Sequence, residues 1–73
     1  MNHWRAQVKP AYDILDRYGI LHNALHNALL RNGFHYVRTQ QGQYLIQHPS
    51  QYGLMMLRFR EPAVFEQISF EEN

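Results

Sequence analysis

The sequence predicts an α+β domain in which an N-terminal helical region covers one face of a three-stranded antiparallel sheet. Apolar residues between Ala11 and Ala28 recur at alternating three- and four-residue steps, which gives a helix one buried side. Three short runs within residues 34–60 are rich in apolar and aromatic side chains and are separated by glycine- and proline-containing segments, as is typical of strands. We therefore expect a single domain, residues 1–73, that ends in a short helix or a fourth strand.

The helical region is predicted to run from residue 10 to residue 32. Pro10 suits the first turn because its missing N–H is not needed there, and Asn32-Gly33 is a typical helix end. Gly19 disfavours an uninterrupted helix by about 1 kcal/mol relative to alanine. The region is thus one kinked helix or a pair of helices, and residues 1–9 show no periodicity that predicts an element.

The predicted strands cover residues 34–40, 43–48 and 54–60. A two-residue turn at Gln41-Gly42 places Val37 opposite Ile46 and Arg38 opposite Leu45. A three-residue loop with Gly42 at a bulge is the alternative, and it shifts the second strand by one residue. Residues 63–70 fit a short helix after Pro62 or, with alternating apolar residues, a fourth strand.

With the two-residue turn, the register of the strands decides which side chains lie on the covered face of the predicted sheet and which on the outer face. The covered face would consist of Val37, Ile46, Met55, Leu57 and Phe59. Aromatic, arginine and methionine side chains are enriched at protein interfaces. We therefore expect the residues of these types on the outer face to bind a partner, namely Tyr36, Arg38, Met56, Arg58 and Arg60.

His22 and His26 are one helical turn apart and are the best candidates for metal ligands. A zinc or iron site requires at least one further protein ligand, and the nearest carboxylates, Asp13 and Asp16, lie well upstream. No Ser, Cys or Lys is paired with a base in a recognisable motif. We expect no metal, no cofactor and no enzymatic activity.

The run from Leu29 to Arg38, the glycine turn, His48-Pro49 and Gly53-Leu54 together resemble the HicA (YcfA-like) toxin family over residues 29–59. The resemblance implies an α-β-β-β-α fold like that of double-stranded-RNA-binding domains, and contact with RNA. In that family a Gly-Ser-His at the first hairpin provides the catalytic histidine, and Gln43 stands at that position here. Because glutamine does not exchange protons near neutral pH, we do not expect the family's ribonuclease activity.

The composition bears on whether the protein binds nucleic acid and on where in the cell it is expected. Seven Lys and Arg against six Asp and Glu give a net charge of +1, which does not by itself predict a nucleic-acid-binding protein. The chain has no cysteine and no apolar run long enough for a membrane span, which favours the cytoplasm.

These observations predict a non-catalytic binding module. It would be a small regulatory or inhibitory protein, of the kind that mobile elements encode, that acts through a protein partner. An RNA-binding protein or a HicA-like mRNA interferase is the alternative. A homodimer would add buried surface to a chain of this size.

Overall fold

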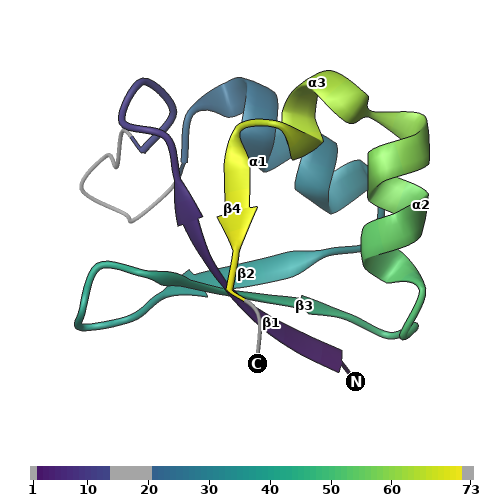
Figure 1. Ribbon diagram of the computed structural model, residues 1–73, viewed down its shortest axis with the longest axis horizontal. Helices are drawn as coiled ribbons and strands as arrows, with labels where there is room; N and C mark the ends of the chain where they lie inside the picture. The colour runs from purple at the N-terminus through teal and green to yellow at the C-terminus, as the bar shows by residue number, and fades with distance from the viewer. Residues whose placement is uncertain (1, 14–20, 72–73) are drawn as a thin grey trace.

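The computed structural model describes residues 2–13 and 21–71. Within them the elements follow one another as β1 (Asn2–Val8), α1 (Asn23–Arg31), β2 (His35–Arg38), β3 (Tyr44–His48), α2 (Gly53–Arg60), α3 (Pro62–Phe65) and β4 (Ile68–Phe70). The strands form one antiparallel sheet in the order β2-β3-β1-β4, and the helices lie on one of its faces (Figure 1). The α+β class is thus confirmed. Its order is β-α-β-β-α-α-β, which is the ferredoxin-like β-α-β-β-α-β arrangement with two helices, α2 and α3, in the second crossover. This order differs from the α-β-β-β-α order that the HicA resemblance implies.

The strand β1, where no element was predicted, lies in the middle of the sheet. Ala6 pairs with Tyr44 of β3 on one side and with Phe70 of β4 on the other. Residues of β1 alternate between the two faces of the sheet. Trp4, Ala6 and Val8 face the helices, and His3, Arg5 and Gln7 are exposed on the open face.

The β2–β3 hairpin has the three-residue loop, so the two-residue turn was wrong. The Thr39 N–H donates to the Gln43 carbonyl at 2.7 Å, and the Gly42 N–H donates to the Thr39 carbonyl at 3.1 Å. Gly42 has a φ of 84°, a left-handed conformation that glycine adopts without strain and that is typical of such loops. In consequence Tyr36 lies opposite Ile46, Val37 opposite Leu45 and Arg38 opposite Tyr44.

Residues 54–60, predicted as the third strand, belong to the helix α2. Their Leu and Met side chains are unbranched at Cβ and favour helix, and the segment contains no β-branched residue. The sheet also offers no place for the predicted strand beside β3, because β2 and β1 already occupy its two sides. The end of the chain contains both of the predicted alternatives, since residues 62–65 form the short helix α3 and residues 68–70 form the strand β4.

The predicted helical region is only partly helical among the described residues. The amides of Tyr12 and Asp13 both bond to the Lys9 carbonyl, which makes a single turn after Pro10. The expected kink at Gly19 lies outside the described residues. The end of the region is confirmed, since α1 stops at Arg31 and Gly33 follows with a φ of 82°.

The core lies between the sheet and the helices. It is formed by Ala6, Val8, Leu21, Leu25, Leu29, Phe34, Tyr44, Ile46, Leu57 and Ile68. Ile46 and Leu57 are fully buried, as predicted, but Val37 lies on the open face of the sheet and is 55% exposed. No helix in residues 2–13 and 21–71 has the length and apolar character that a membrane crossing requires.

Candidate protein-binding surface

The five predicted site residues do not share one face. Tyr36 is half-buried on the side of the sheet that the helices cover, where its hydroxyl lies 3.1 Å from the Leu21 amide and 2.7 Å from Nδ1 of His26. It therefore connects the sheet to the start of α1. Arg38 is exposed at the end of β2. Met56, Arg58 and Arg60 belong to the helix α2 and not to a strand. The five residues therefore do not form the common sheet surface that the sequence predicted.

The feature that replaces it is an apolar stripe on the outside of α2, which we call the outer stripe. It consists of Tyr52, Met55, Met56 and Phe59, which follow the i, i+3, i+4, i+7 spacing of one helix face. Met55 is 69% exposed and Phe59 is 87% exposed. The opposite side of α2 is also apolar, since Leu57 is buried and Leu54 packs against the core. A helix that is apolar on both sides is typical of one covered on both sides.

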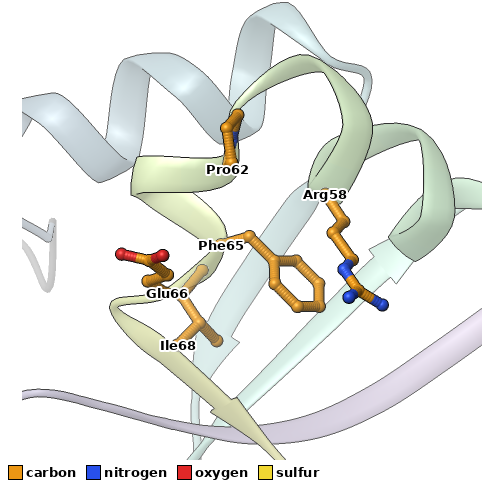
Figure 2. Close-up of a pocket in the computed structure, with 5 residues that line it drawn as sticks. All are labelled: Arg58, Pro62, Phe65, Glu66 and Ile68. Carbon is orange, nitrogen blue, oxygen red and sulfur yellow. The ribbon is translucent and has the colours of Figure 1, made fainter.

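Two adjoining hollows lie beside the outer stripe, where α2 meets α3. Met55, Arg58, Phe59 and Pro62 line an open hollow of about 500 Å³. Arg58 and Pro62 also line a second hollow of about 350 Å³, and Figure 2 shows the ring of Phe65, another lining residue, between Ile68 and Arg58. The Phe65 ring stacks on Phe70, with ring centroids 5.5 Å apart, so α3 and β4 hold it in place. The hollows provide a largely apolar surface next to the stripe.

The charged side chains of α2 itself are both positive. Arg58 and Arg60 are both exposed. The Glu61 carboxylate, at the end of α2, forms an ion pair with Arg31 and accepts a hydrogen bond from Asn32, and this is the one ion pair within the described ranges. Figure 2 shows the Glu66 carboxylate pointing away from the Arg58 guanidinium. Neither arginine of α2 is therefore neutralised by a described carboxylate.

Both ring nitrogens of the buried His48 are hydrogen-bonded to the protein backbone. Its Nδ1 accepts the Ser50 N–H at 2.9 Å, and its Nε2 lies 3.1 Å from the Asn32 carbonyl oxygen. Because a carbonyl only accepts, Nε2 carries the proton and the ring is neutral with both nitrogens used. The Gln43 amide, at the position of the HicA histidine, donates to Glu71. Across the described residues no histidine is hydrogen-bonded to a carboxylate.

The histidines His22 and His26 have separate partners. His22 is the N-cap of α1, where its Nδ1 accepts the Ala24 N–H at 3.2 Å, whereas His26 contacts the Tyr36 hydroxyl. In the part of the chain that the structure describes, no three His, Cys, Asp or Glu side chains are grouped as metal ligands would be. The absence of a bound metal stays a prediction.

The sequence analysis singled out Met56, Arg58 and Arg60, which the structure places on or beside the outer stripe, and their role in binding stays a prediction. It did not single out Tyr52, and it placed Met55 and Phe59 on the covered face. The helical spacing from residue 52 to residue 59 was the signal that identifies the stripe. Comparison with protein-family models, curated proteins and solved structures found no match to this chain.

Proposed function

We propose that this protein is a non-catalytic binding module, a small cytoplasmic regulatory or inhibitory protein that binds a protein partner through the outer stripe of α2. The exposure of the stripe is the observation that carries the proposal. An exposed phenylalanine and two methionines on one helix face lose contact with water when a partner covers them, at about 25 cal/mol per Å² of apolar surface. Exposed apolar groups gathered in this way mark interaction sites more often than single exposed residues do.

The composition of the surface also favours a protein partner. Phe59 and the methionines would form a buried centre, and Arg58 and Arg60 a polar rim, which is the usual anatomy of an interface. The stripe lies on a helix whose inner side is anchored by Leu57, so its side chains are presented on a rigid support. A rigid support lowers the entropy cost of binding.

RNA binding has weaker support. Single-stranded RNA is bound by sheets that stack bases on aromatic side chains. Among the described residues the open face of the sheet has no Phe, Tyr or Trp, and the strand pairing indicates that it carries His3, Arg5, Gln7, His35, Val37, Leu45, Gln47 and Ser69. His3 and His35 are the only aromatic rings in that set. Arg5 is the one permanently charged cation in that set.

The proposal is tested by affinity capture from an extract of the source cells with the immobilised full chain. We expect a partner that wild type retains and that Phe59→Gln and Met55→Gln lose, since glutamine keeps the helix propensity but removes the apolar contact. Val37→Thr is the matched control, because it removes an exposed apolar side chain from the opposite face of the molecule. A partner that all four proteins retain equally would refute the proposed site.

A further inference from the structure

We infer that the partner segment bound by the outer stripe is an amphipathic helix whose apolar face is flanked by aspartate or glutamate. This inference rests on the proposed function and adds the shape and the charge of the partner. The shape follows from the backbone of α2 and the hollows beside it. The charge follows from the surroundings of Arg58 and Arg60.

The backbone of α2 favours a helical partner. An extended peptide binds by adding a strand to a sheet edge, where free N–H and C=O groups satisfy its own backbone. The α2 helix offers no strand edge, because its amides donate along the helix axis, as that of Met56 does to the Tyr52 carbonyl. The outer stripe lies on the side of the helix and offers contacts mainly through side chains. A segment that docks there without water must satisfy its own backbone, as a helix does.

The surface also has the form that a helix fits. The outer stripe spans two turns of α2, and the open hollow of about 500 Å³ lies along it. α2 lies at the margin of the helical layer (Figure 1), so a partner helix beside it would extend the layer. Side chains at i, i+3, i+4 and i+7 of that helix would pack between Met55 and Phe59 and into the hollow.

The charge of the partner follows from Arg58 and Arg60, which form no ion pair with a carboxylate among the described residues. At 100° per residue, Arg58 and Arg60 lie on either side of Phe59 around the helix axis. Both therefore border the apolar centre of the stripe. The carboxylate nearest to them in the sequence, Glu61, is already bound by Arg31 and Asn32. Carboxylates on both sides of the partner's apolar face would pair with the arginines, and guanidinium binds carboxylate in a bidentate geometry.

The same charges disfavour a second copy of this chain as the partner. In a two-fold dimer through the outer stripe, the same patch meets itself. Each copy would bring Arg58 and Arg60 to the interface and no free carboxylate of α2 to match them. Like charges placed together at an interface are unfavourable, so a partner of opposite charge is preferred.

The test uses the full chain and labelled synthetic peptides of about 14 residues, which is about four helical turns. The acidic probe has leucine at i, i+3, i+4 and i+7 with glutamate on both flanks. The basic probe replaces every glutamate with lysine, and the scrambled probe has the acidic composition without the spacing. Fluorescence anisotropy measures the dissociation constant of each probe. We expect wild type to bind the acidic probe roughly tenfold or more tightly than the basic and scrambled probes.

Variants assign the binding to the surface. Phe59→Gln should raise the dissociation constant of the acidic probe at least roughly tenfold, since aromatic residues at the centre of an interface dominate its affinity. The Arg58→Glu, Arg60→Glu double variant should prefer the basic probe, and Arg58→Gln, Arg60→Gln should lose the preference. Val37→Thr should bind as wild type does, and thermal melts verify that each variant is folded.

Two results would overturn the inference while the outer stripe remains a binding site. One is Phe59-dependent binding of the basic probe at least as tight as that of the acidic probe. The other is a wild-type dimer in sedimentation that Phe59→Gln dissociates. Absence of binding to every probe would also overturn the inference, and the capture experiment then decides separately whether the stripe binds any protein.

Discussion

Gly53 begins α2 directly against the imidazole ring of His48. A Cβ atom at position 53 would lie 2.5 Å from Cγ and 2.7 Å from Nδ1 of that ring. The ring cannot move aside freely, because both of its nitrogens are hydrogen-bonded and Phe34 packs against it with ring centroids 4.5 Å apart. Glycine is therefore required here by space, not by backbone conformation.

We predict that Gly53→Ala destabilises the protein by about 1–3 kcal/mol, the usual cost of overpacking. Helix propensity alone predicts the opposite sign, a gain of up to about 1 kcal/mol. Denaturant unfolding measures the change. As a control, Gly53→Ala should be neutral or stabilising in a His48→Ala background, where the ring is gone. Equal effects in both backgrounds would show that the ring is not the cause.

A second prediction at this scale concerns Tyr44. Burial raises the pKa of the Tyr44 phenol above its usual range, and the hydrogen bond to the Asp13 carboxylate and its negative charge raise it further, while Arg38 opposes the shift. Because the folded pKa exceeds the unfolded value of about 10, the neutral phenol contributes its full stability below about pH 10. That contribution is lost as the pH rises through the folded pKa.

We therefore expect the free energy of unfolding to fall as the pH is raised above about 10, and to fall less steeply in Tyr44→Phe. Urea unfolding at a series of alkaline pH values measures both slopes. Identical slopes in the two proteins would mean that ionisation of Tyr44 is not linked to unfolding.

The helix α2 presents one apolar side to the core and another to solvent. We predict that Leu57→Ala, on the inner side, costs about 2–5 kcal/mol of stability, because it leaves a cavity in the core. Phe59→Ala, on the outer side, should change stability by within about 0.5 kcal/mol, and so should Arg58→Glu. Thermal melts compare the three variants. A Phe59 variant that unfolds while the Leu57 variant melts normally would mean that the two sides are exchanged.

The same helix explains why the sequence prediction of elements was only partly right. In residues 54–60 the set Met55, Leu57 and Phe59 alternates as in a strand, while Leu54 and Leu57 are spaced as in a helix, and a run this short does not distinguish the two. Its type depends on the place left for it in the fold. The end of α1 was predicted correctly because Asn32-Gly33 is a local signal.

The candidate site was affected by the hairpin loop as well as by α2. A one-residue change in register exchanges the faces of a strand, and this moved Tyr36 to the covered side. The strand β1 was missed because alanine, at Ala6, occupies its most central buried position and is a weak signal in a strand pattern. Residue types predicted Arg58, Arg60 and Met56 as binding residues, but their common surface depends on tertiary structure.

At the scale of the whole molecule, we predict that the protein does not cleave RNA. His48 is buried with both nitrogens used, and His35 is exposed on the open sheet face with no described carboxylate bonded to it. General acid–base catalysis needs a base within reach of the substrate, and usually a group that orients it. Total RNA incubated with purified protein should remain intact on a denaturing gel. Cleavage that disappears in His35→Ala, and persists in Val37→Thr, would contradict this prediction.

Because β1 lies in the middle of the sheet, the sheet cannot be complete before the last of its strands has been synthesised. Of the four strands of this sheet, β1 is synthesised first and its two neighbours, β3 and β4, last, since Ala6 pairs with Tyr44 and Phe70. The β2–β3 hairpin closes locally, within about 1–10 μs for an isolated hairpin. The sheet is completed only when β4 emerges, because loop-closure entropy opposes such distant pairings. Until then the apolar side of β1, including Trp4 and Val8, is exposed on the nascent chain, where chaperones can bind it.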